Sequence, residues 1–120
     1  MSKGRVIPFV TMPPSEEDRV QAALRLALIT SSQGYAVIVY LVLYSVVLAK
    51  RSVFEKLSEA TRKMITDAMN AGVRIVACKV AMQGFNVNDE ELMNGIAIWE
   101  PKDLLSPLRA PYSFRCNWSY

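Results

Sequence analysis

The sequence predicts an α/β fold, a three-layer α/β/α sandwich built on a five-stranded, mainly parallel sheet, and three observations lead to it. Short apolar runs alternate with segments whose apolar residues recur at helical spacing, an order typical of parallel sheets covered by helices. One run, Tyr35–Leu43, is apolar almost throughout, as expected for a parallel strand buried on both faces. Single glycines, Gly34, Gly72 and Gly95, stand where helical segments end.

The length and composition predict one folded domain spanning residues 1–120. A chain of 120 residues can bury a core without disulfides or metal, and single domains commonly have about 100–150 residues. Hydrophobic residues make up 52% of the chain and charged residues 21%, which argues against a disordered chain.

The strands are expected where short apolar or alternating runs occur. They are Arg5–Thr11, Tyr35–Leu43, Val73–Cys78, Ile96–Trp99 and the alternating run Tyr112–Cys116. Pro8 lacks an N–H group, which favours an edge or bulged position for the first strand, or a later start of that strand.

The first helix is expected after Ser15, which precedes an acidic run and so predicts an N-cap with acids in the first turn. Apolar residues then recur at helical spacing up to Gly34. Tyr44 and Ser45 form the predicted corner after the second strand. The further helices are expected at Val46–Lys50, Phe54–Ala71, Asn88–Met93 and Pro101–Leu105.

Charge and hydropathy patterning exclude several classes of protein. The net charge is +3, and the basic residues are dispersed without interleaved aromatics, so we expect no nucleic-acid partner. Tyr35–Ala49 carries no charge, but it is shorter than the roughly 20 residues that cross a membrane, so we expect core and no membrane association. Met1–Arg5 is not followed by a signal-peptide core, and the chain has only two cysteines, which predicts a cytoplasmic protein with free thiols.

The residue types present also limit the chemistry. The chain has no histidine, which excludes Ser-His-Asp triads, Cys-His pairs and His-based zinc sites. It has no CxxC, no GxGxxG and no P-loop motif, so we expect neither a metal nor a cofactor. Asp89, Glu90 and Glu91 are either acid–base groups or the first turn of a helix, and the helix interpretation is favoured.

Cys78 is the main candidate for chemistry. It ends a predicted strand, directly before Lys79 and near Gly84, and ligands gather past the carboxyl ends of parallel strands. One interpretation is a buried structural cysteine, since free cysteine is among the most buried residue types. The other is a thiolate favoured by Lys79 and by backbone N–H groups of residues 81–88, although strand alternation would point the Lys79 side chain the other way. Such a thiolate could hold sulfur as a persulfide or exchange with disulfides.

The segments Ala71–Cys78, Gly84–Phe85 and Glu90–Ile96 together resemble the DsrE/DsrF/TusD-like family, and the resemblance extends over roughly Arg5–Phe114. It implies a three-layer α/β/α domain with a five-stranded, mainly parallel sheet, often assembled into homo- or hetero-oligomers. In the sulfur-transfer members, the cysteine at the place of Cys78 accepts and donates persulfide sulfur. The chain departs from the family where many members have a glycine, since the second strand here is followed by Tyr44-Ser45-Val46.

We therefore expect a cytoplasmic sulfur-relay or thiol-redox protein, a sulfur carrier or sulfurtransferase that uses Cys78. Its partners would be persulfidated proteins or small sulfane-sulfur compounds, and the chain would form a homo-oligomer (dimer, trimer or hexamer). The alternative is a non-catalytic oligomeric module of the same fold that binds a small ligand or serves assembly. Cys116 is either an incidental thiol or a resolving cysteine. The residues expected to tune the thiol or line its pocket are Lys79, Met82, Gln83, Gly84, Phe85, Tyr44 and Ser45.

Overall fold

The structure is a computed structural model that describes residues 4–104 and 113–117. For residues 104 and 113–117 only the backbone is described. The predicted strand at Tyr112–Cys116 corresponds to a strand at Ser113–Asn117, and Tyr112 itself lies outside the described residues.

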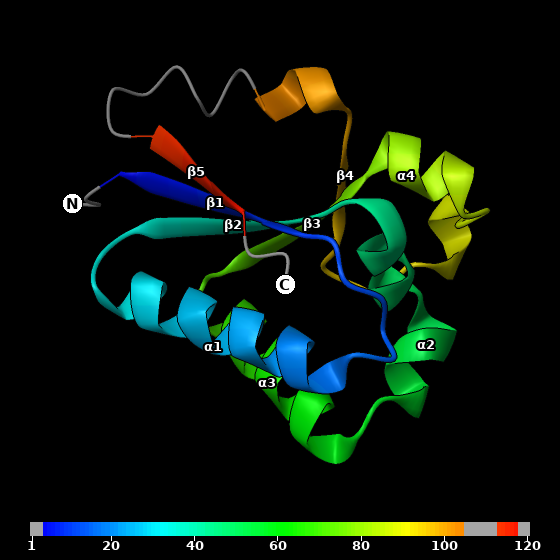
Figure 1. The fold of residues 1–120 in the computed structure, drawn as a ribbon, viewed down its shortest axis with the longest axis horizontal. Helices are drawn as coiled ribbons and strands as arrows, with labels where there is room; N and C mark the ends of the chain where they lie inside the picture. Colours follow the sequence, from blue (N-terminus) through cyan, green and yellow to red (C-terminus); the bar gives the residue numbers. More distant parts are fainter. Residues whose placement is uncertain (1–3, 105–112, 118–120) are drawn as a thin grey trace.

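A single twisted sheet forms the centre of the molecule (Figure 1). Its strands follow the order β4-β3-β2-β1-β5, and each neighbouring pair is parallel. This confirms the predicted α/β class and the parallel sheet. The strands are β1 (Arg5–Val10), β2 (Ala36–Leu41), β3 (Arg74–Cys78), β4 (Ala97–Trp99) and β5 (Ser113–Asn117).

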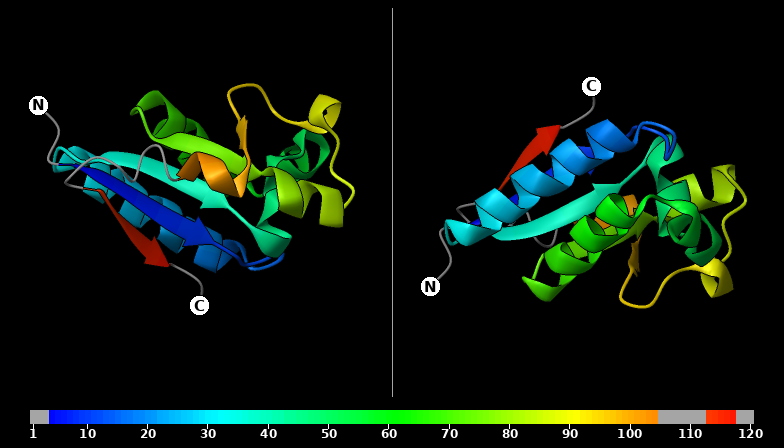
Figure 2. Two further views of the ribbon diagram at one scale, coloured as in Figure 1. Left: turned by 90° about the horizontal axis from the view of Figure 1, so that it is seen from above. Right: turned by 90° about the horizontal axis from the view of Figure 1, so that it is seen from below.

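Two long helices, α1 (Glu17–Ser32) and α3 (Glu59–Asn70), lie side by side on one face of the sheet (Figure 2). The opposite face carries the 3-10 helix η3 (Pro101–Leu104) (Figures 1 and 2). Within the described part of the chain, no α-helix covers this second face. The described residues therefore form the sheet and one of the two predicted helical layers.

Short elements gather at the carboxyl ends of the central strands (Figure 1). They are the 3-10 helix η1 (Leu43–Ala49), α2 (Arg51–Lys56), α4 (Lys79–Gly84) and the 3-10 helix η2 (Asp89–Glu91). These connections follow β2 and β3, so the residues at the ends of both strands share one edge of the fold.

Strand alternation divides the core into two clusters. Ile75 and Ala77 point into the larger cluster, between the sheet and the helices α1 and α3. Val76 and Cys78 point to the opposite face and into the smaller cluster. The near-continuous apolar sequence of β2 follows from this division, since both of its faces are buried.

Several predicted boundaries are corrected by the structure. The first helix begins at Glu17, and its N-cap is Glu16, which makes no side-chain capping bond, so the N-cap predicted at Ser15 is wrong. The predicted helix Phe54–Ala71 is interrupted, because the Ser58 hydroxyl accepts a hydrogen bond from the Thr61 amide and begins a new helix there. The predicted corner is one residue late, since η1 begins at Leu43.

Pro8 lies in an interior strand, not at an edge. β1 pairs with both β2 and β5, which corrects the edge position predicted from the missing N–H group. The register of β1 with β2 pairs Val6 with Val37 and Phe9 with Tyr40, without a partner for Pro8 in β2. The pairing of β1 with β2 thus tolerates Pro8, which has no N–H group to donate.

The acidic run after Asn88 makes local contacts that stabilise the start of a helix. The Asn88 backbone N–H donates to Glu91 Oε1 at 2.9 Å, as part of a capping box at the start of η2. Glu91 also pairs with Lys50 at 3.1 Å. These contacts support the helix-start interpretation over acid–base chemistry.

A polar cluster joins the beginnings of α1 and α3. Glu17 Oε1 accepts hydrogen bonds from the Ser58 amide at 3.1 Å, the Ser58 hydroxyl at 2.7 Å and the Thr61 hydroxyl at 2.5 Å. The Thr61 hydroxyl, which is fully buried, also accepts from Gln21 Nε2 at 2.9 Å. The bonds from Thr61 and Ser58 lower the pKa of the Glu17 carboxyl below its usual value of 4.5.

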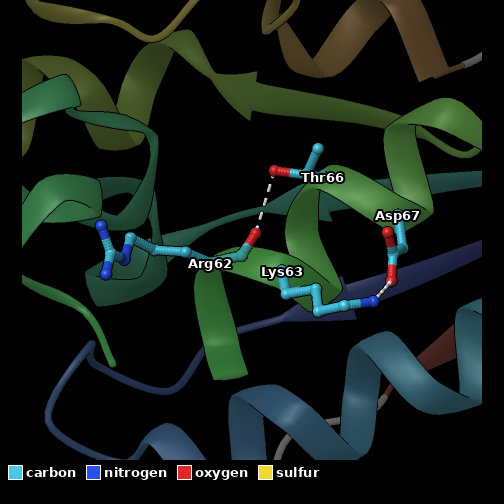
Figure 3. Close-up of polar contacts among 4 residues, drawn as sticks. All are labelled: Arg62, Lys63, Thr66 and Asp67. Carbon is cyan, nitrogen blue, oxygen red and sulfur yellow. Dashed lines mark hydrogen bonds and ion pairs between the residues drawn. The ribbon is translucent and has the colours of Figure 1, made fainter. Parts of the chain in front are cut away.

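The exposed side of α3 carries local contacts (Figure 3). Lys63 Nζ lies 3.1 Å from Asp67 Oδ2, one turn further along, and the Thr66 hydroxyl donates to the Arg62 carbonyl at 3.0 Å (Figure 3). An exposed pair of this kind contributes only about 0.3–0.5 kcal/mol. The position of α3 therefore depends on its buried face and on the Glu17 cluster.

The turn after β2 holds a strained residue. Leu43 has φ +53°, in the left-handed region, and its side chain is 61% exposed. For a residue with a Cβ this conformation costs about 1–2 kcal/mol. Glycine is the residue usually favoured in this conformation, and here Leu43 adopts it.

Substituting Leu43→Gly is expected to raise the free energy of unfolding by about 1 kcal/mol, because it removes the Cβ strain and little packing is lost. Urea denaturation measures this change. Tyr44→Gly is the matched control, since that neighbour has no left-handed φ and should lose stability. Equal losses in both variants would contradict strain at Leu43.

Substituting Glu17→Gln is expected to lower the free energy of unfolding at pH 7 by about 1 kcal/mol, because charge-assisted acceptor bonds are lost. The folded-state pKa of Glu17 is lowered, so its contribution is present above the unfolded value of 4.5 and disappears as the pH falls through the folded value. The difference between wild type and variant should therefore shrink below pH 4.5. Thermal denaturation across pH tests this, with the exposed neighbour Asp18→Asn as control.

Candidate functional site

Cys78 is the last residue of β3 and the N-cap of α4, with φ −76° and ψ 122°. Its side chain makes no capping hydrogen bond. Strand alternation turns it to the same face as Val76, where the residue is 6% exposed. Cys78 is a free cysteine, and the side chain of Cys116 lies outside the described residues.

The thiol lies in an apolar environment. The buried side chains that share its cluster come from the three central strands and are Ile7, Ile38, Tyr40 and Val76. Ala81 and Trp99 pack against this cluster, and Trp99 pairs with Cys78 in the register of β3 and β4. These side chains therefore limit the access of a reagent to the sulfur.

Tyr40 brings a second polar group into the cluster. The residue is 1% exposed, and its hydroxyl oxygen makes no hydrogen bond to any described residue. Tyr40 pairs with Val76, so Cys78 is its diagonal neighbour two residues further along β3, within reach of an aromatic side chain.

Burial first, and then the nearby Cys78 thiol, raise the pKa of the Tyr40 hydroxyl well above its usual value of 10.0. The two residues share one buried cluster, and the hydroxyl makes no hydrogen bond of normal geometry to a described residue. Asp103 on η3 acts on the hydroxyl in the same direction.

The predicted pKa-tuning residues lie mostly apart from the thiol. Lys79 is exposed and lines a groove of about 380 Å³ together with Met82, Gln83 and the segment 86–90. Cys78 does not line this groove. The physical reason is the alternation at the end of β3, which sends consecutive side chains to opposite sides.

The segment after Cys78, whose backbone N–H groups were expected to favour the thiolate, begins with the helix α4. Gly84 is the last residue of α4, and the Phe85 amide donates to the Ala81 carbonyl at 3.0 Å. The Val87 amide donates to the Met82 carbonyl at 2.8 Å. These amides satisfy the end of the helix, so the structure does not direct them at the thiol.

Tyr44 and Ser45, predicted to line the pocket, have different surroundings. The Ser45 side chain is fully buried, and its hydroxyl is directed at the carbonyl oxygens of Val10 and Val42, the latter at 2.8 Å. It thereby ties η1 to the end of β1. The Tyr44 ring is exposed and lies 5.0 Å from the ring of Phe85.

An exposed apolar surface results from this arrangement, since η1 and α4 contact each other. We call it the carboxyl-edge patch, and it consists of Leu43, Tyr44, Val80 and Phe85.

A polar groove of about 570 Å³ lies on the same face as Cys78, toward the amino ends of the strands. Arg74, Trp99 and Asp103 line it, and the Arg74 guanidinium stacks 5.5 Å from the centre of the Trp99 ring. Trp99 is shared by this groove and by the cluster that holds Cys78.

Tyr40 and Trp99 are the site residues that sequence reasoning did not select. One signal was present, because Tyr40 is the only residue with a side-chain hydroxyl between Ala36 and Val42. Its position beside Cys78 depends on the register between β2 and β3, which the sequence does not show.

Among the described residues, no group of three or more cysteine and acidic side chains is arranged to hold a metal ion. The described helices include none with the length and apolar character needed to cross a membrane.

Solved structures of other proteins have the same fold, and three of them are the following. The ychN protein of E. coli has a TM-score of 0.77 at 17% identity, covering 95% of this chain and 98% of that one. The MTH1491 protein of Methanobacterium thermoautotrophicum has a TM-score of 0.74 at 14% identity, with coverage of 95% and 98%. The BT1422 protein of Bacteroides thetaiotaomicron has a TM-score of 0.68 at 18% identity, with coverage of 94% and 93%.

A search of curated proteins found no significant match. The family model of the DsrE/DsrF-like family matches residues 5–106, which include β1 to β4 and the site around Cys78. The resemblance noted in the sequence is thus confirmed, and the chain belongs to the DsrE/DsrF-like family.

Proposed function

We propose that this protein carries sulfur as a persulfide on Cys78 and passes it from a donor to an acceptor. The observation that carries the proposal is the position of Cys78, a free thiol at the carboxyl end of a central strand in a DsrE/DsrF-like chain. Persulfidated proteins and small sulfane-sulfur compounds are the donors and acceptors of matching chemistry. A free thiol of this kind suits a reducing compartment such as the cytoplasm.

The transfer needs no external oxidant. The Cys78 thiol loses its proton to solvent, and the thiolate attacks the outer sulfur of a donor persulfide. The S–S bond of the donor breaks, its inner sulfur leaves as a thiolate, and a new S–S bond forms on Cys78. Attack by an acceptor thiolate on the outer sulfur then reverses these roles and regenerates Cys78.

The burial of Cys78 is compatible with such a carrier when α4, whose Ala81 packs against the cluster, can move locally. α4 is a single short helix of six residues, and Met82 is its one buried side chain. A segment with so few buried contacts opens at a small cost in free energy. In the closed state, the apolar cluster would keep the sulfur away from water and competing thiols.

Incubation with glutathione persulfide is expected to add about 32 Da, one sulfur atom, to the wild-type protein, and dithiothreitol should remove it. Intact-mass spectrometry measures the gain. Cys78→Ser should abolish it, while Cys116→Ser should retain it, because the sulfur resides on Cys78.

Two results would count against a carrier. An adduct retained by Cys78→Ser would place the chemistry elsewhere, and no adduct on the wild type would favour a non-catalytic module. The folding of each variant is checked by thermal denaturation, so that a missing adduct reflects chemistry and not unfolding.

We also propose that the protein is a homo-oligomer assembled through the carboxyl-edge patch. Four large apolar side chains are exposed together there, and three of them, Leu43, Tyr44 and Val80, are more than half exposed. Apolar surface of this kind typically marks an interaction site. The same observation supports the second candidate function, an assembly module without thiol chemistry.

Replacing Tyr44 and Phe85 together by serine is expected to shift the wild-type oligomer toward smaller species, because the exposed ring pair is lost. Analytical ultracentrifugation at several concentrations measures the change. The matched control is the exposed apolar pair on α1, Leu26→Ser with Ile29→Ser, which should leave the assembly intact. A monomeric wild type, or dissociation only of the α1 variant, would contradict this interface.

A further inference from the structure

The cluster around Cys78 contains one polar atom that nothing in its surroundings uses. Tyr40 is 1% exposed, and its hydroxyl oxygen has no hydrogen-bond partner among the described residues. Buried polar groups are almost always paired, and an unpaired hydroxyl destabilises the fold. A phenylalanine would fill the same space without this cost, so packing alone does not account for the oxygen.

The strand register places the Tyr40 ring in the same cluster as the sulfur. Tyr40 lies opposite Val76 in the parallel register, and Cys78 is the next residue of β3 on the same face. The Phe9 ring packs against the Tyr40 ring at 5.5 Å and limits its movement. Tyr40 and Cys78 are both buried members of the same small cluster.

We propose that the Tyr40 hydroxyl is the hydrogen-bond donor to the sulfur on Cys78 in its charged states, the thiolate and the persulfide anion. The inference rests on the proposed function, and it adds a catalytic residue that contacts the reacting atoms. A neutral thiol is a weak acceptor, whereas a sulfur anion is a strong one. The hydroxyl therefore lacks a partner in the resting state and gains one when the reaction begins.

The two charged states place the negative charge on different atoms. In the thiolate the charge is on Cys78 Sγ, and after transfer it is on the outer sulfur of the persulfide. The phenolic hydrogen can rotate about the C–O bond, so one donor can follow the charge. Because burial keeps Tyr40 protonated, it remains a donor throughout the physiological range of pH.

Other charged groups lie on the elements around Tyr40 and Cys78. Asp103 on η3 raises the pKa of the Tyr40 hydroxyl, and the neighbouring elements also carry cations. Those cations are Arg5 on β1, Arg74 on β3 and Lys79 at the start of α4. None of these groups changes charge near neutral pH, so the effect of removing one hydroxyl can be measured against a constant background.

The test compares wild type with Tyr40→Phe, both in a Cys116→Ser background so that one thiol remains. The rate of alkylation by iodoacetamide is followed against pH by intact mass. The midpoint of the wild-type profile should move up by about one pH unit in Tyr40→Phe, a loss of roughly tenfold in reactivity below the midpoint. After loading with glutathione persulfide, the lifetime of the sulfur on the variant should differ from that on wild type, because the donor to the persulfide anion and to the leaving thiolate is lost.

Tyr35→Phe is the matched control, because it removes a phenolic hydroxyl just before the amino end of the same strand and should leave the profile unchanged. A profile and a persulfide lifetime in Tyr40→Phe that match wild type would overturn the inference. A purely structural hydroxyl would leave both unchanged and would alter only the thermal midpoint.

Two further measurements keep the test decisive. If Tyr40→Phe does not fold, the carbon resonance next to the Tyr40 hydroxyl is followed in labelled wild-type protein, and it must titrate together with Cys78. If wild type never accumulates the persulfide, the proposed function fails, while the alkylation profile still decides whether Tyr40 donates to the thiolate.

Discussion

The parallel pairing of β1, β2 and β3, buried on both faces, is the constraint on which the rest of the structure depends. It requires continuous apolar strands, and it brings their carboxyl ends to one edge of the fold. Alternation along β3 then divides its residues between two clusters. Ile75 and Ala77 support the packing of α1 and α3, while Val76 and Cys78 belong to the opposite face. The environment of the thiol is thus a consequence of core packing.

This placement protects the sulfur from water, but it also limits the access of a sulfur donor. The apolar cluster limits the access of water, and Ala81 of the short helix α4 packs against this cluster. Backbone strain lies at the same edge, where Leu43 takes a left-handed conformation after β2. Strain of this kind concentrates at functional sites, because a merely structural turn would use glycine.

Polar groups in the interior fall into two kinds. Ser45 and Thr61 are fully buried and hydrogen-bonded, and they hold η1 against β1 and α3 against α1. Tyr40 is the contrast, since its buried hydroxyl has no partner among the described residues and lies beside Cys78. A satisfied network fixes a scaffold, whereas an unsatisfied donor is available to a group that appears during a reaction.

The sequence by itself determined the α/β class, the parallel sheet and the place of Cys78 at a strand end, because these depend on apolar periodicity and chain order. It also carried the motifs of the DsrE/DsrF-like family, which the family match confirms. Only the tertiary structure decided what surrounds the thiol. Lys79 turns into a separate groove, and Ser45 is used by the scaffold, because strand alternation and long-range carbonyl partners decide such directions. Tyr40 meets Cys78 through the register of β2 with β3, a pairing between distant segments that no local pattern specifies.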